Sequence, residues 1–308
     1  MKLLLGIVCG LMGLTLVAEA GVFQVRWDVE DQAIGPAGII TAANEHDDFN
    51  PVGNPTVVNV TGAAATFTGS SKAISLDGTT DRFDQTQWDG AYNGIDKDLA
   101  VLEMYFSPNG LTGGRREILF ETGGNGDGLA FGIESGMLIF GAINANSPGR
   151  TAGHAEVDLL SPTFSSFVQG ADYFYAKAQI NAEFNYIQLR VEDKDGNVLS
   201  NKQTLLNGST DFIDWTGGNA AALGGVGGND YARGSGATGD VFFGGGSGGA
   251  LPFQGRIASF TLTYSKVPEP STAAYCALFV GLLATWRNRR NASLFDFMDT
   301  EDEGPARY

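Results

Sequence analysis

The chain has 308 residues, of which 35 are acidic and 19 basic, so its formal net charge is −16 and its pI is near 4.4. This balance argues against a nucleic-acid partner, because phosphate binding needs a basic face. The two cysteines, Cys9 and Cys276, lie near the two ends. The region between them therefore has no disulfide and no thiolate metal site, and it must be stabilised by its core.

The first 20 residues have the three parts of an export signal. Lys2 supplies a positive charge, Leu3–Val17 is apolar, and Ala18-Glu19-Ala20 fits the small-x-small pattern at which signal peptides are cleaved. We therefore predict a signal peptide over 1–20, cut between Ala20 and Gly21. An uncleaved membrane anchor is the alternative.

The region 21–266 has the length of one large all-β domain, and its apolar residues alternate with polar ones as in half-buried strands. The predicted strands are Phe23–Val29, Val57–Val60, Ala65–Thr68, Lys72–Leu76, Leu99–Phe106, Glu117–Glu121, Leu129–Ile133, Met137–Gly141, Tyr173–Ile180, Tyr186–Val191, Val198–Leu199 and Gly255–Tyr264. Glu134-Ser135-Gly136 predicts a hairpin turn. Many short strands with glycine-rich and polar turns indicate a two-sheet antiparallel sandwich or jelly roll.

Glycine pairs and one triplet make 217–250 a low-complexity stretch. Ordering glycine carries a large entropic cost, so this stretch predicts a loop, apart from a strand at Asp240–Phe243. The loop is either a surface excursion or a binding loop.

Several pieces, in order, resemble the laminin-G-like and concanavalin A-like lectin or glucanase jelly roll. They are Ala73–Phe83, Leu99–Phe106, Leu129–Ile133 with Met137–Phe140, Asn185–Val191 with Asp195-Gly196, and Gln254–Phe260. The resemblance implies binding of carbohydrate or protein at a sheet face or rim, in some members with calcium. Some relatives cleave glycans.

An exposed indole can stack on a sugar ring, so the tryptophans of this region are candidate ligand contacts. The group with aromatics beside amide and carboxylate side chains is Trp88, Asp89, Tyr92 and Asn93. Trp27 and Trp215 are further candidates. Packing in the core or in a loop is the alternative for each.

Calcium is the one cofactor that the sequence suggests. Asp127 and Asp230 follow glycine-rich runs that nearly match the nonapeptide of calcium-binding repeats. The runs are not repeated in tandem, so they do not indicate a stack of calcium sites. The remaining possibility is a single calcium ion at the rim of the sandwich. Asp193, Asp195 and Asn197 alternate as in a calcium loop, yet Gly196 comes too early, so a hairpin turn is predicted. We interpret the acidic surroundings of His46 as a solvated loop rather than a metal site.

Glu156 and Asp158 resemble the catalytic strand of jelly-roll glucanases. Retaining hydrolysis needs two carboxyl groups about 5–5.5 Å apart. The further glutamate of that family is replaced here by Leu160 or Ser161. We therefore predict a protein that is not an enzyme, with a glycoside hydrolase as the alternative.

Near the C-terminus, three features follow one another. Pro268, Glu269 and Pro270 stop any preceding strand or helix, and the apolar run 272–286 suits a short helix in lipid. The cations Arg287, Arg289 and Arg290 follow and favour the cytoplasmic side.

This order resembles the PEP-CTERM sorting signal of Gram-negative bacteria over 267–290. The resemblance implies that the partner of this segment is an exosortase, a membrane transpeptidase that processes the protein. The acidic tail 291–308 departs from the family, whose members usually end at the arginines. A plain membrane anchor is the alternative.

Both ends thus predict export as a single-pass membrane precursor, to the cell surface, the outer membrane or the extracellular matrix. The predicted role is non-catalytic binding, with surface polysaccharide as the expected ligand. A protein-binding adhesin remains an alternative, as does the hydrolase.

Overall fold

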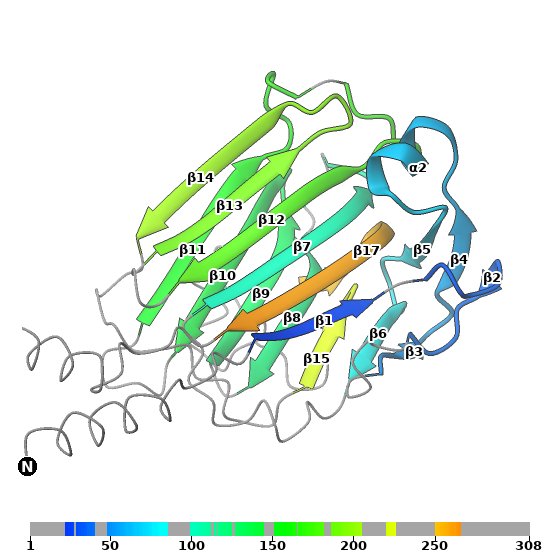
Figure 1. Ribbon diagram of the computed structural model, residues 1–308, viewed down its shortest axis with the longest axis horizontal. Coiled ribbons are helices and arrows are strands. Elements are labelled where there is room, and N and C mark those ends of the chain that lie inside the picture. Colours follow the sequence, from blue (N-terminus) through cyan, green and yellow to red (C-terminus); the bar gives the residue numbers. More distant parts are fainter. Residues whose placement is uncertain are drawn as a thin grey trace, which may run out of the picture. The chain divides into compact units, whose positions relative to one another are not determined.

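The computed structural model describes residues 22–27, 29–40, 48–85, 99–111, 114, 116–124, 127–144, 151–164, 166–181, 186–204, 220–225 and 250–265. All of them belong to one compact unit, Gly21–Val267. They form two β-sheets stacked as two layers, with one short helix (Figure 1).

The larger sheet has nine strands, and all its pairs are antiparallel. The strands are β1 (Val22–Trp27), β2 (Gly35–Pro36), β4 (Thr56–Asn59), β5 (Lys72–Asp77), β7 (Leu99–Pro108), β12 (Phe174–Asn181), β13 (Tyr186–Glu192), β14 (Val198–Thr204) and β17 (Gln254–Ser265). Their order is β14-β13-β12-β7-β17-β5-β4-β2, and β1 also pairs with β17.

The smaller sheet has eight strands. They are β3 (Asn50–Val52), β6 (Arg82–Gln85), β8 (Arg116–Gly124), β9 (Asp127–Glu134), β10 (Met137–Asn144), β11 (Thr151–Asp158), β15 (Ala220–Leu223) and β16 (Ala250–Pro252). The order is β11-β10-β9-β8-β15-β6-β3, and β16 runs parallel to β8. The predicted two-sheet sandwich is therefore confirmed, including the hairpin at Ser135-Gly136 between β9 and β10.

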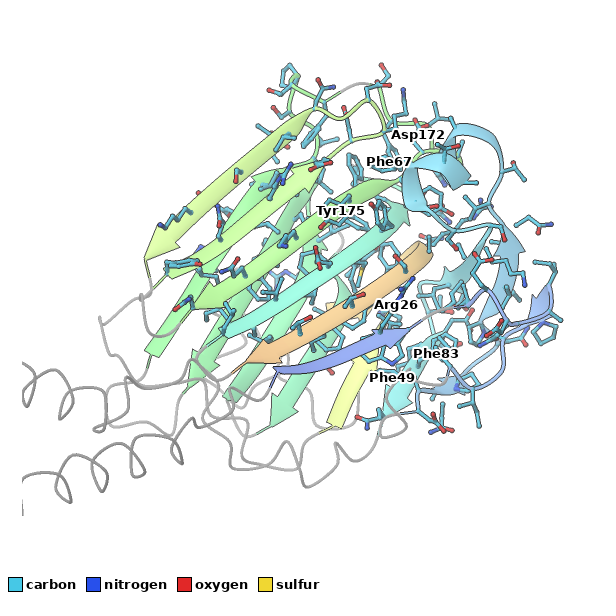
Figure 2. The ribbon with its side chains drawn as sticks, viewed as in Figure 1. Arg26, Phe49, Phe67, Phe83, Asp172 and Tyr175 are labelled. Atoms are coloured by element: carbon cyan, nitrogen blue, oxygen red, sulfur yellow. The ribbon has the colours of Figure 1, made fainter. Side chains whose placement is uncertain are left out.

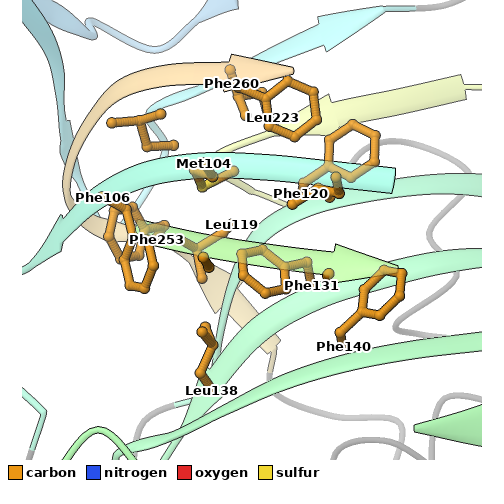
Figure 3. Packing of buried hydrophobic residues seen from close by; sticks show 14 of the residues in the cluster. Met104, Phe106, Leu119, Phe120, Phe131, Leu138, Phe140, Leu223, Phe253 and Phe260 are labelled. Carbon is orange, nitrogen blue, oxygen red and sulfur yellow. The ribbon is translucent and has the colours of Figure 1, made fainter. Parts of the chain in front are cut away.

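The core lies between the sheets because each strand turns its apolar residues inward. Along β7, Leu102, Met104 and Phe106 are fully buried, and the residues between them point outward. Phe260 of β17 and Phe120 of β8 meet across the sandwich with ring centroids 4.6 Å apart (Figure 3). These inter-sheet aromatic contacts join the two layers.

The prediction of a strand at Ala65–Thr68 is wrong, because the structure has a helix there, α2 (Gly62–Thr68). Three alanines favour the helix, and Gly69 ends it in the left-handed conformation with φ 66°. Phe67, with two of the alanines, packs on a small cluster on the outward side of the larger sheet around Tyr173. Four residues of alternation are too few to distinguish a strand from one face of a short helix.

The prediction that 217–250 is loop except at Asp240–Phe243 is also wrong at both ends of the stretch. Ala220–Leu223 is β15, inserted between β8 and β6, and Ala250–Pro252 is β16. Gly224, which follows β15, has φ 77°, a backbone conformation that favours glycine, and a Cβ there would also lie 2.3 Å from Leu76 Cδ1. Asp240–Phe243 lies outside the described residues.

Among the described residues, no helix has the length and apolar character that crossing a bilayer requires. The predicted signal peptide 1–20, the sorting signal 267–290 and the tail 291–308 lie outside the part of the chain that the structure describes.

Candidate functional site

The outward faces of the two sheets differ in what they expose. At the centre of the smaller sheet, even the side chains on the outward face are buried. They alternate with core residues along the strands and are Ile118, Ala130, Ile139 and Ala222. On the larger sheet, β7, β12, β13 and β14 present polar and aromatic side chains that are partly or fully exposed. The outward face of these four strands is therefore the better candidate for contact with a ligand.

We call this surface the tyrosine face. It is formed by side chains that alternate with core residues along the four strands: Val101, Glu103, Tyr105, Tyr175, Lys177, Gln179, Tyr186, Gln188, Arg190, Glu192, Val198, Ser200 and Lys202. The strand register aligns them in rows across the sheet, such as Glu103, Lys177 and Arg190 on three successive strands.

Two tyrosines form the aromatic centre of one end of the tyrosine face. The rings of Tyr105 and Tyr175 lie 4.9 Å apart, and Phe67 of α2 meets Tyr105 edge-on at 5.4 Å. Figure 2 shows Phe67 and Tyr175 on the outward side of the larger sheet. Helix α2 thus borders the face at this end.

The two tyrosine hydroxyls stay protonated at neutral pH. Tyr175 Oη donates a hydrogen bond to Glu103 Oε1 at 2.5 Å. Burial, together with this hydrogen bond and the negative charge of Glu103, raises the pKa of Tyr175. Burial and the nearby carboxylates of Glu192 and Glu103 raise the pKa of Tyr105 as well. Each hydroxyl can therefore act as both donor and acceptor.

Charged and amide side chains surround the rings. Lys177 Nζ lies 3.3 Å from Glu103 Oε1, and Arg190 forms an ion pair with Glu192. At the other end, Gln179 Nε2 donates to Tyr186 Oη, and Lys202 Nζ sits 4.7 Å from the centroid of the Tyr186 ring.

Three cations and two carboxylates thus share the tyrosine face, although the whole chain carries a net charge of −16. Flat rings beside donors and acceptors of this kind suit a ligand with an apolar face and many hydroxyl groups.

Most sites predicted from the sequence lie outside the described residues. They are Trp88, Asp89, Tyr92, Asn93, Trp215, Asp230, the cleavage pair Ala20 and Gly21, and the sorting residues Pro268, Glu269, Pro270, Arg287, Arg289 and Arg290. His46, which we interpret as part of a solvated loop, also lies outside the described residues. Asp127 begins β9, where its backbone pairs with Gly124. Trp27 is a core residue stacked on Phe260 at 4.0 Å, so it does not face a ligand.

The predicted hairpin turn at Asp193–Asn197 is confirmed. The Asp193 carboxylate accepts the backbone N–H groups of Asp195 and Asn197, each at 2.9 Å, and the Asn197 side-chain amide. It therefore caps its own turn. The described residues hold no group of three or more His, Cys, Asp or Glu side chains that could bind a metal ion.

Glu156 and Asp158 lie on the exposed side of the edge strand β11, and Asp158 Oδ1 accepts the Leu160 N–H at 2.8 Å. Glu121, a buried carboxylate that sequence reasoning missed, shares their side of the sheet. Three strand spacings separate β8 from β11, roughly 14 Å. Glu121 is therefore too far to complete a hydrolytic pair with Glu156.

The tyrosine face was also missed, although a signal existed. The outward residues of the predicted strands Leu99–Phe106, Tyr173–Ile180 and Tyr186–Val191 include every tyrosine of the face. The sequence did not show that these three strands are neighbours.

No family model matches the sequence, and neither does any curated protein. The sequence-independent comparison with solved structures finds many of similar fold, among them two with a TM-score of 0.50. One is the binding domain of botulinum neurotoxin DC in complex with rat synaptotagmin II, with 9% identity over 82% of this chain and 50% of that one.

The other is the ligand binding domain of botulinum neurotoxin serotype D in complex with N-acetylneuraminic acid, with 8% identity over 82% of this chain and 49% of that one. This chain thus spans about half the length of the structures that it resembles. Identity this low supports a shared β-sandwich fold and nothing finer.

Proposed function

We propose that the protein is a non-catalytic carbohydrate-binding protein of lectin-like jelly-roll type, and that the tyrosine face contacts the sugar. One observation carries the proposal: the partly exposed ring pair Tyr105 and Tyr175 lies beside a row of hydrogen-bonding side chains. Aromatic rings pack on the apolar face of a sugar ring, and the neighbouring donors and acceptors bind its hydroxyl groups.

The proposal also includes the cellular location. An export signal over 1–20 and a PEP-CTERM-like segment over 267–290 support delivery through an exosortase to the cell surface or extracellular matrix of a Gram-negative bacterium. Mass spectrometry of the mature protein tests this part. A start at Gly21 and an end near Pro270 are expected, whereas a cytosolic protein with Met1 and Tyr308 intact would contradict it.

A glycan array, with and without calcium, tests carbohydrate binding. For a glycan that binds, replacing Tyr105→Ala or Tyr175→Ala should weaken affinity about two- to twelvefold each, since an aromatic contact contributes about 0.5–1.5 kcal/mol. Tyr175→Phe keeps the ring and should retain most of the affinity. Lys194→Ala, in the exposed β13–β14 turn, is the matched control and should bind as the natural protein does.

Three outcomes would count against this proposal. Failure to bind any glycan under either condition removes the carbohydrate role. Capture of a protein partner that no sugar displaces favours an adhesin. Cleavage of a polysaccharide that Glu156→Gln abolishes favours a hydrolase.

A further inference from the structure

We propose a second binding site, at one end of the sandwich, that takes an uncharged sugar residue. It rests on the proposed function only in that its ligand is also a sugar. The site is a pocket of about 430 Å³, which falls within the range of about 300–1,000 Å³ typical of small-molecule sites. Its lining is Gly110, Leu111, Leu159, Leu160, Ser161, Pro162, Phe164, Ser166, Phe167 and Gln169.

The chain holds the pocket in shape by hydrogen bonds along the segment that leads from β11 to β12. Leu159 N donates to Gly136 O at 3.0 Å, and Phe164 N donates to Ser161 O at 3.0 Å. Farther along, Arg256 Nη1 donates to Gly170 O at 2.6 Å. The segment is thus anchored to other elements near both ends and forms a turn of its own in between.

The lining combines an apolar floor with polar groups. Leu111, Leu159 and Phe164 are buried and form the apolar part, whereas Ser166 and Gln169 are exposed. Phe167 stacks on Phe174 with centroids 5.0 Å apart and an interplanar angle of 6°, which fixes its ring. A floor that packs apolar carbon and a rim that donates and accepts hydrogen bonds match the two sides of a pyranose ring.

The charges near the pocket select an uncharged ligand. Among the described residues that line it, none carries an ionisable side chain. Two carboxylates flank the segment, but Asp158 accepts the Leu160 N–H at 2.8 Å and Asp172 accepts the Val168 N–H at 2.7 Å. A uronic or sialic acid would find no cation among the described lining residues, so a carboxylate that is desolvated against them would lose free energy on entry.

The pocket and the tyrosine face can be tested separately because they share no residue. Strand β12 links the two sites: its residue Phe174 points inward and stacks on Phe167 of the pocket, and the next residue, Tyr175, points outward on the tyrosine face. Figure 2 places Asp172 at the same end of the sandwich as Phe67 and Tyr175.

The experiment measures binding of neutral monosaccharides and disaccharides, such as glucose, galactose and cellobiose, to the purified full chain by saturation-transfer NMR. Ser166→Trp should block the pocket and lower affinity at least tenfold, and Gln169→Ala should lower it about threefold. Val168→Trp is the matched control, because Val168 is exposed on the same segment, does not line the pocket and has no side-chain atom that can hydrogen-bond to the lining. It should bind normally, and Tyr175→Ala reports separately on the tyrosine face.

Each outcome decides between the sites. Loss of binding in Ser166→Trp alone, with unchanged thermal unfolding, supports the pocket. Loss in Tyr175→Ala with full binding in Ser166→Trp overturns the pocket and leaves the tyrosine face as the sugar site. If no neutral saccharide binds the natural protein, the pocket proposal is wrong, while glycans bound on the array would still support the proposed function.

Discussion

Glu30 shows how a single carboxylate fastens the segment after β1 to the rest of the larger sheet. Its side chain accepts hydrogen bonds from the hydroxyl groups of Ser70 and Ser71, at 2.5 and 2.6 Å. It also accepts the backbone N–H groups of Ser71 and Lys72. These bonds, led by the one from Ser70, lower the pKa of Glu30 from its ordinary 4.5 to about 2.

The depressed pKa predicts a stability that depends on pH. Ionised Glu30 stabilises the fold above pH 4.5, and this contribution disappears as the pH falls from about 4.5 to about 2. The variant Glu30→Gln should therefore unfold at a lower temperature than the natural protein at pH 7. The difference should shrink at pH 2.5 in thermal unfolding followed by circular dichroism. An equal difference at both pH values would contradict this account.

At the scale of one element, β17 organises the larger sheet. It pairs with β7 along one side and with both β5 and β1 along the other. Gly255 allows the close approach to β7: its φ is 157°, and a Cβ there would lie 2.3 Å from Ser107 O and 2.6 Å from Phe253 Cζ.

Gly255→Ala should destabilise the protein by about 3 kcal/mol or more, because neither a backbone carbonyl nor a buried ring can move aside. Gly38→Ala is the matched control, since nothing crowds a Cβ at that position except one atom at 4.0 Å. The Gly38→Ala substitution should change the free energy of unfolding by no more than about 0.5 kcal/mol. Urea unfolding measures both, and a stable Gly255→Ala variant would refute the packing argument.

The sequence predicted the long elements well and the short ones poorly. Strand β7 was visible because four inward residues alternate with outward ones. Strand β17 was visible from its length, although a bulge between Ile257 and Ser259 interrupts its alternation. Helix α2 and β15 were missed because each spans few residues and depends on its neighbours: α2 on Tyr173, β15 on its place between β8 and β6. The tyrosine face needed strand order, which no local pattern encodes.

At the scale of the whole molecule, an aromatic group joins the two sheets. Phe260 of β17 contacts Phe120 of the smaller sheet at 4.6 Å and Trp27 of β1 at 4.0 Å. All three are almost fully buried. By contrast, Phe67 packs only on the outward side of the larger sheet.

Phe260→Ala should therefore cost about 3–5 kcal/mol of unfolding free energy, as is usual for a phenylalanine deleted from a core. Phe67→Ala removes a ring that is only partly buried, so we expect a clearly smaller loss. Guanidinium unfolding compares the two variants. A loss for Phe67→Ala as large as that for Phe260→Ala would mean that the inter-sheet cluster does not dominate stability.

The central claim is that a glycan lies on the tyrosine face, and hydroxyl-radical footprinting of the protein with an array-selected glycan tests it most directly. An isomeric sugar that does not bind, at the same concentration, corrects for radical scavenging. We predict that the bound glycan protects Tyr105, Tyr175 and Tyr186 from oxidation and leaves the control unchanged. Equal oxidation of these three tyrosines with the binding and the non-binding sugar would contradict the claim.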